Sequence, residues 1–234
     1  MRLSDRHGKI LAAAIGPSDT AVASWRDWRA THRVVDADGE ESRLLALVLA
    51  RLGAAVDDDP ELDRVRRLRR HMWATRTRVE AGLAQCIADL GAAGVPAMVV
   101  KGMGANQYYP EPFLRWVNDV DVVVPADRRC DAWSALWAGG WRPALGLDLT
   151  GVEAMSARHP GHGFVCGRSE IDLHVRPIHD VAWSARLDTM LWQAATSRPS
   201  GSGSVRVPLA EHHVVIIAGH ARRFASGSVL QGLV

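Results

Sequence analysis

The stretch that decides the fold reads VVKGMG at residues 99–104 and is followed by NDVDVVV at residues 118–124. The apolar residues from Ala97 to Val100 predict a short buried strand. Glycine in the turn that follows allows the backbone to bend tightly and to admit a ligand that a side chain would block. The valines of residues 120–124 predict a second buried strand. We therefore take these two strands and their turn as the centre of the fold.

Two aspartates lie two positions apart at the second strand. Side chains alternate along a strand, so Asp119 and Asp121 are expected on one face with Cα atoms roughly 6.5 Å apart. Carboxylates at that spacing repel each other unless a cation lies between them, and oxygen ligands of this kind suit Mg²⁺ or Mn²⁺. The alternative for Asp119 is a turn cap. The valines after Asp121 imply burial, and a buried carboxylate needs a partner.

Several motifs in a fixed order carry a family resemblance. They are Lys101-Gly102 after a strand, Arg115, the Asp-Val-Asp segment, and Ile-Asp-Leu-His at residues 171–174. This order resembles the nucleotidyltransferase superfamily, to which polymerase β belongs. It is more closely similar to the uncharacterised nucleotidyltransferase family, in which Lys-Gly stands where most members of the superfamily have Gly-Ser. The resemblance extends from about residue 25 to the end of the chain and implies a third carboxylate at Asp172.

The resemblance implies an α+β fold, with a nucleotidyltransferase-type mixed β-sheet core flanked by helices and with helical segments at both ends. We expect residues 1–92 to be helical, residues 93–180 to form the α/β core, and residues 181–234 to be helical again. Apolar residues recurring at threes and fours predict one amphipathic helix of about 30 residues within 62–90. The Ser/Gly-rich segment 197–204 predicts a flexible loop.

The resemblance also implies a metal-dependent enzyme that moves a nucleoside monophosphate from an NTP to an acceptor. The acceptor is a small molecule, a peptide or protein side chain, or an RNA end. Asp119, Asp121 and Asp172 would hold Mg²⁺ or Mn²⁺, and Asp172 would also serve as general base. Removing Asp119 or Asp121 is expected to leave the fold intact or to stabilise it, because clustered like charges repel. The residues expected to bind the nucleotide are Lys101, Gly102, Gly104, Arg115 and Asn118.

His174 lies two residues after Asp172 and is expected on the same strand face, where it would support the metal ligands. The other histidines of the second half, among them His159 and His162, raise the alternative of a zinc site. That pair lies in a Pro/Gly loop and lacks the helix and glutamate of a hydrolytic metal motif. Scattered core or surface histidines are therefore the favoured interpretation.

Two other functions stay open. One keeps the fold and the metal but uses a nucleotide sugar as donor, so that a glycosyl group is transferred. The other is a non-catalytic nucleotide-binding module. It is favoured by the absence of Gly-Ser from the phosphate loop and opposed by the presence of all three carboxylates.

The composition is that of a soluble globular protein, with 47% hydrophobic and 23% charged residues. The net charge of +2 argues neither for nor against an anionic partner. Three widely spaced cysteines favour a reducing compartment, and no apolar run approaches the ~20 residues of a membrane span. Residues 10–15 faintly resemble a secretory signal but are too short. A cytoplasmic location without membrane contact is expected.

Arginines dominate the outer face of the long helix expected within 62–90. One interpretation is a phosphate-binding stripe for RNA or nucleotide, and the other is a solvated face partly neutralised by nearby acids. The run lacks interleaved exposed aromatic residues of the kind that single-strand binders use, which favours the solvated face. The arginines of this face are Arg64, Arg66, Arg67, Arg69, Arg70, Arg76 and Arg78.

The end of the chain is unusually apolar. Residues 214–217 are apolar on nearly all sides and are predicted to be buried, and residues 229–234 have the spacing of an amphipathic helix face. A face that apolar must be covered by another surface. We therefore expect either a homo-oligomer formed through residues 209–234 or a longer natural protein of which this chain is a part.

Overall fold

The structure is a computed structural model that describes residues 4–156, 161–178, 184–201 and 203–223. The described residues form two compact units. The first holds residues up to 74 together with residues 109–116, and the second holds residues 75–108 and the described part of 117–223. Helix α4 (Leu62–Ala92) begins in the first unit and ends in the second. Each unit is described by itself.

The first unit is helical, as expected. Its helices α1 (Asp5–Ile15), α2 (Ser18–Arg29) and α3 (Gly39–Leu52) pack with the first turns of α4 around an apolar cluster that includes Trp25 and Trp28. Short 3₁₀ turns at Val34–Asp36, Gly53–Val56 and Pro112–Leu114 join or extend these helices.

Helix α3 begins at a reciprocal cap that the sequence specifies. The Asp38 side chain accepts hydrogen bonds from the backbone N–H groups of Glu40 and Glu41, and the Glu41 side chain accepts one from the backbone N–H of Asp38. Such a capping box satisfies donors that a helix start otherwise leaves unpaired. The helix ends at Leu52, and Gly53 is its C-cap residue.

Helix α4 confirms the long amphipathic helix. It has 31 residues, so that its axis is about 46 Å long at 1.5 Å per residue. Its buried side chains recur at the expected spacing, with Leu62 and Val65 in the core of the first unit and Leu83 and Leu90 in the core of the second.

The second unit is built on one mixed sheet of seven strands, in the order β3-β4-β5-β2-β1-β7-β6. Strand β2 is antiparallel to β1 and parallel to β5, while β4–β5 and β6–β7 are antiparallel hairpins. The α+β class with a mixed sheet is therefore as expected. The strands are β1 Met98–Val100, β2 Asp121–Val123, β3 Arg142–Pro143, β4 Gly161–Cys166, β5 Ser169–His174, β6 Thr196–Ser200 and β7 Gly203–Val207.

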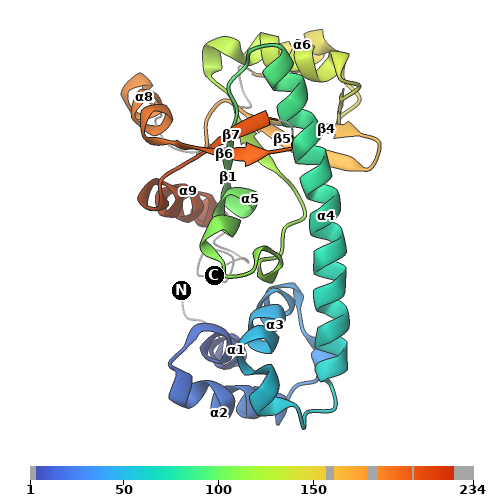
Figure 1. Ribbon diagram of the computed structural model, residues 1–234, viewed down its shortest axis with the longest axis vertical. Coiled ribbons are helices and arrows are strands. Elements are labelled where there is room, and N and C mark those ends of the chain that lie inside the picture. Colours follow the sequence, from blue (N-terminus) through green and yellow to red (C-terminus); the bar gives the residue numbers. More distant parts are fainter. Residues whose placement is uncertain (1–3, 157–160, 179–183, 202, 224–234) are drawn as a thin grey trace. The chain divides into compact units, whose positions relative to one another are not determined.

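Helices cover both faces of this sheet (Figure 1). On one face, the second half of α4 and helix α6 (Arg129–Ala138) pack on Val99, Val122 and Ile171. On the other face, α8 (Ala185–Ala194) and α9 (Ala210–Arg223) pack on Met98, Val100 and Val123. Helix α7 (Leu149–Ser156) contributes Val152 to the first of these clusters, and the short helix α5 (Lys101–Ala105) contacts α9. Alternate side chains of the central strands thus belong to two apolar cores, one on each face of the sheet.

Two expectations about local structure were wrong. The Ser/Gly-rich segment is the β6–β7 hairpin, because Gly201 adopts a positive φ of 56° at the turn and the flanking residues pair in register. The chain from Val214 to Ile217 is not buried throughout, since α9 turns only Ile216 fully inward and leaves Val214 and Val215 exposed.

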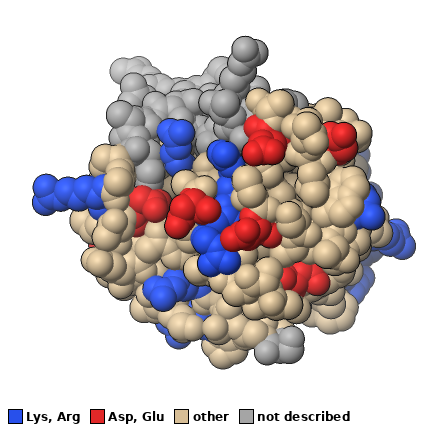
Figure 2. Space-filling view, turned by 90° about the horizontal axis from the view of Figure 1, so that it is seen from above, with Lys and Arg blue, Asp and Glu red and all other residues tan. Residues whose placement is uncertain are grey.

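Among the described residues, no helix has the length and apolar character needed to cross a membrane. Figure 2 shows one face of the molecule, on which the coloured basic and acidic side chains are interspersed and neither sign forms a broad patch. The described part of this face therefore offers no extended basic surface to a polyanion. The expected apolar helix face at residues 229–234 lies outside the described residues, so the expectation of a homo-oligomer stays a prediction.

Candidate metal and nucleotide site

The centre of the sheet brings two carboxylates together. Strands β2 and β5 are parallel neighbours, and their register places Asp121 opposite Asp172 and Val123 opposite His174. Ile171 and Leu173 point into the core under α4 and α6, so alternation turns Asp172 and His174 to the opposite face. Two strands that are far apart in the sequence thereby present their polar side chains at one place.

These side chains form a group that fits a divalent cation. One carboxylate oxygen of Asp121, one of Asp172 and a ring nitrogen of His174 all lie within 4.8 Å of one another. Two carboxylates suit Mg²⁺, and a set that adds an imidazole also suits Mn²⁺. Asp121 and His174 are buried and Asp172 is half-buried, so the group is enclosed yet reachable from one side.

Lys101 completes the group from the turn after β1. Its ammonium Nζ lies 2.5 Å from Asp121 Oδ1, and His174 Nε2 lies 2.9 Å from the same oxygen. Lys101 has a φ of 51°, the only positive φ of a non-glycine residue in the described part of the chain. The lysine, and not the glycines that follow it, therefore makes the left-handed turn at this position.

Charge and burial separate the pKa values of the carboxyl groups. Burial alone would raise the pKa of Asp121, but the hydrogen bond from His174 and the charge of Lys101 outweigh it and hold this pKa below its usual range. Burial raises the pKa of Asp172, and the negative charge of Asp121 adds to that effect. Asp121 is therefore held as a carboxylate, while Asp172 takes up a proton more readily than an ordinary aspartate.

Asp119 lies beside this group and not within it. Strand β2 begins at Asp121, so Asp119 precedes the strand. The residue is exposed as a whole and does not belong to the described cluster of ligand atoms. Loss of water around its carboxylate, followed by the charges of Asp121 and Asp172, raises its pKa. The two neighbouring carboxylates thus act on Asp119 even though the residue as a whole is reached by solvent.

Two glycines of β4 give the site its space, and the sequence interpretation did not single them out. Gly161 pairs with His174 and Gly163 pairs with Asp172 across the β4–β5 hairpin. A Cβ on Gly161 would lie 2.2 Å from His174 Nδ1, and one on Gly163 would lie 3.3 Å from Asp172 Oδ1. The alternate glycines of Gly161-His162-Gly163 in a strand, where glycine is otherwise unfavourable, were the available signal.

The other residues expected to bind a nucleotide have different surroundings. Gly104 is buried against α9, where a Cβ would lie 2.6 Å from both His213 Cε1 and the Val99 carbonyl oxygen, whereas a Cβ on Gly102 would make only ordinary contacts. Asn118 is exposed. Arg115 belongs to the first unit, where its guanidinium donates a hydrogen bond to Tyr109 Oη at 3.3 Å. The nucleotide-binding roles of these residues stay predictions.

The remaining histidines form no second metal-type cluster among the described residues. His162 packs edge-on against Trp133, with ring centroids 5.9 Å apart, and His213 is buried beside Tyr108. His159 and His179 lie outside the described residues.

Part of the arginine face on α4 is neutralised and part is not. Arg66 pairs with Asp57 and Asp63, Arg69 pairs with Glu111, and Arg76 pairs with Glu80. The helix also carries an exposed aromatic side chain, Trp73, which the sequence interpretation overlooked.

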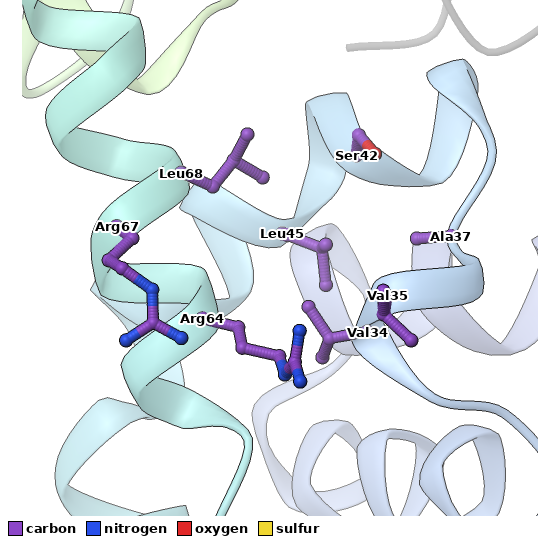
Figure 3. Close-up of a pocket in the computed structure, with 8 residues that line it drawn as sticks. All are labelled: Val34, Val35, Ala37, Ser42, Leu45, Arg64, Arg67 and Leu68. Carbon is purple, nitrogen blue, oxygen red and sulfur yellow. The ribbon is translucent and has the colours of Figure 1, made fainter.

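Two arginines of this face line a pocket of about 270 Å³ in the first unit (Figure 3). Arg64 extends from α4 toward Val34, and Arg67 lies one turn further along the helix. Neither guanidinium forms a hydrogen bond or an ion pair with another described residue. The other residues that line the pocket are Val35, Ala37, Ser42, Leu45 and Leu68.

The centre of the mixed sheet thus presents two carboxylates and a histidine, on adjacent strands, that could hold a divalent cation. The family model of the uncharacterised nucleotidyltransferase family matches residues 26–231, so the chain belongs to that family. No curated protein and no solved structure shows significant similarity to the chain.

Proposed function

We propose that this protein transfers a nucleoside monophosphate from an NTP to an acceptor hydroxyl or similar nucleophile, at the site formed by Asp121, Asp172 and His174. The observation that carries the proposal is the register of β2 and β5, which sets the two aspartates opposite each other with their ligand atoms within 4.8 Å of those of His174. Membership of the nucleotidyltransferase family supports the same reaction class.

The reaction exchanges one phosphate ester bond for another. The acceptor oxygen forms a bond to the α-phosphorus, the bond from that phosphorus to the oxygen bridging to the β-phosphate breaks, and pyrophosphate leaves. A divalent cation bound by the carboxylates would neutralise negative charge on the phosphates. Catalysis of this kind depends chiefly on positioning and charge, so few side chains need to take part in covalent chemistry.

The chain's own residues divide this work. Asp121 is fixed as an anion by His174 and Lys101 and would serve as the constant ligand. Asp172, whose pKa is raised, is suited to accept the proton that the acceptor loses. Gly161 and Gly163 leave open the space in front of His174 and Asp172 that the reacting groups need. Asp119, at the exposed rim, would add a third carboxylate.

The direct test uses NTPs labelled at the α-phosphate, with Mg²⁺ or Mn²⁺, and three acceptor pools made of small molecules, peptides and RNA. Transfer of the α-label with release of pyrophosphate is expected, and Asp121→Asn should abolish it. The same assay with a labelled nucleotide sugar covers the glycosyl-transfer alternative. Binding of Mg²⁺-ATP without turnover in any pool, unchanged by Asp121→Asn, would replace the proposal with a non-catalytic nucleotide-binding role.

A further inference from the structure

We infer that the Lys101 ammonium occupies the place of a cation at Asp121, and that a metal ion must displace it to bind. The inference rests on the proposed metal site but adds a competition between a residue of the chain and the ion. Lys101 would thus hold the site ready in the metal-free protein and withdraw when the metal arrives.

The first support is that the contacts at Asp121 are one-sided. Lys101 Nζ and His174 Nε2 both lie within hydrogen-bond distance of Oδ1, at 2.5 and 2.9 Å, and Oδ2 accepts no hydrogen bond from the described residues. A metal ion bound to either oxygen of Asp121 would therefore share the carboxylate with a positive charge that is already in place. Two cations on one buried carboxylate repel each other, so the ion must compete with Lys101 for Asp121.

The second support is the charge of the surroundings. Asp119, Asp121 and Asp172 act on one another electrostatically, and the Lys101 charge acts on all three. Lys101 is itself only 8% exposed. Without a cation, a buried carboxylate beside two others is strongly unfavourable. Lys101 supplies the compensating charge that a metal ion would otherwise supply.

The third support is the backbone. A φ of 51° is costly for a lysine and not for a glycine, so the conformation alone does not call for a lysine here. What the lysine adds is a charged group on a flexible four-carbon side chain. Such a side chain can leave Asp121 without any change in the strands, and its ammonium then becomes available to an anion in the site.

The sequence provides a matched control for the test. Lys9 and Lys101 are the only lysines of the chain. Lys9 forms an exposed pair with Asp5 on α1 in the first unit. Lys9→Met and Lys101→Met therefore remove the same charge from two different environments.

The first measurement is Mn²⁺ binding without nucleotide, by electron paramagnetic resonance of the free ion. Lys101→Met is expected to bind Mn²⁺ about tenfold more tightly than the natural protein or more, because the ion no longer competes with a charge-assisted hydrogen bond. Its metal-free melting temperature should fall, and the rise on adding Mn²⁺ should be larger. Lys9→Met should match the natural protein in both respects. Equal or weaker Mn²⁺ binding by Lys101→Met would overturn the inference.

The second measurement needs no variant and so does not depend on the stability of Lys101→Met. Protein labelled only at lysine gives two side-chain signals in a carbon–proton spectrum. Saturation with diamagnetic Mg²⁺ should shift the Lys101 ε-methylene signal and leave that of Lys9 in place. A Lys101 signal that stays fixed while Mg²⁺ binds would contradict displacement. If transfer of the α-label still occurs in that case, the proposed function stands and only this inference fails.

Discussion

Glu41 in the first unit and Asp121 in the second are both buried carboxylates, but their partners are arranged differently. Glu41 is fully buried, and each of its oxygens accepts two hydrogen bonds. Arg6 donates to both oxygens, Trp28 Nε1 donates to Oε1 at 2.8 Å, and the backbone N–H of Asp38 donates to Oε2 at 3.0 Å. Asp121 receives both of its donors on a single oxygen, and its other oxygen accepts no hydrogen bond from the described residues.

The difference distinguishes a carboxylate that stabilises the fold from one that is available to bind a cation. A buried charge needs its acceptor sites filled, and Glu41 has them filled by its own unit. Asp121 keeps one oxygen that accepts nothing from the described residues, and the Asp172 carboxyl on the neighbouring strand has a raised pKa. A buried carboxylate whose acceptor sites are all filled by hydrogen bonds therefore has a structural role here. A buried carboxylate with an unfilled acceptor site is a candidate ligand.

The largest expected effect is that of Asp121→Asn on transfer. Mutation of residues that only orient metal ligands typically lowers metal affinity or activity by about 10–100-fold. Loss of the ligand Asp121 itself should therefore lower kcat/KM by more than about 100-fold. The fold should also lose stability, because Lys101 and His174 lose the anion that holds them. This differs from the expectation drawn from the sequence, in which like-charge repulsion alone decided the outcome.

A transfer assay and a thermal melt of the same preparation test this prediction. If the transfer rate of Asp121→Asn stays within about tenfold of that of the natural protein, Asp121 has only a structural role, like Glu41.

Glu41→Gln sharpens the comparison from the structural side. It breaks a buried pair and leaves Arg6 partly buried without its anion, so we expect a loss of about 3 kcal/mol in the free energy of unfolding. Asp5→Asn is the control, because Asp5 forms an exposed pair with Lys9 and should change stability by less than about 1 kcal/mol. Urea unfolding of both variants provides the measurement. Equal small losses would mean that the filled acceptor sites of Glu41 do little for the fold.

Gly161→Ala tests whether space at the site matters. The new Cβ would lie 2.2 Å from His174 Nδ1, so the ring must move, and overpacking of this kind costs about 1–3 kcal/mol. Mn²⁺ binding should weaken in the same variant, because His174 leaves the ligand group. Gly91→Ala is the matched control, since nothing lies within 4 Å of its Cβ position in α4 and alanine favours helices. Gly91→Ala should melt at the same temperature or higher, with unchanged Mn²⁺ binding.

The smallest expected effect is a gain in stability from Asp119→Asn. The folded state raises the pKa of Asp119, so at neutral pH it is less stable than it would be with a neutral side chain. Removing the charge should raise the free energy of unfolding of the metal-free protein by less than about 1 kcal/mol, because the residue is exposed. The melting temperature should rise modestly with it. The gain should be present at neutral pH and should vanish as the pH falls through the raised pKa toward the unfolded value.

The opposite pH dependence is expected of Asp121, whose pKa is lowered in the folded state. Its contribution to stability is present above the unfolded pKa and is lost as the pH falls through the folded one. Melting curves of Asp119→Asn and of the natural protein between about pH 3 and pH 7 therefore distinguish the two aspartates. A loss of stability in Asp119→Asn at pH 7 would contradict this assignment.

The sequence predicted the centre of the fold well because strand alternation and helix periodicity act locally. Alternation predicted that Asp172 and His174 share one face of their strand, and the family resemblance implied that Asp172 joins Asp121. The position of Asp119 was less predictable, because the strand starts at Asp121, one residue after the start of the valine run, and leaves Asp119 outside it. A change of that size at a strand end moves a side chain out of the alternation.

The parts that were missed depend on contacts between distant residues. The partner of Lys101 lies 20 residues away, and nothing in the turn itself shows that its side chain folds back onto Asp121. Gly161 and Gly163 acquire their meaning only from the β5 residues opposite them. The β6–β7 hairpin was mistaken for a loop because its polar, proline-containing edge strand has none of the apolar residues by which strands are recognised.

The two edges of the sheet also limit how this protein meets other chains. The outermost strands, β3 and β6, contain Pro143 and Pro199 respectively, and a proline offers no N–H to an incoming strand. Edge-to-edge stacking, which begins aggregation in many proteins, therefore meets an interrupted row of donors at both ends. A peptide that binds this protein would have to be recognised through the peptide's side chains, because neither edge of the sheet offers the peptide backbone a continuous row of hydrogen-bond partners.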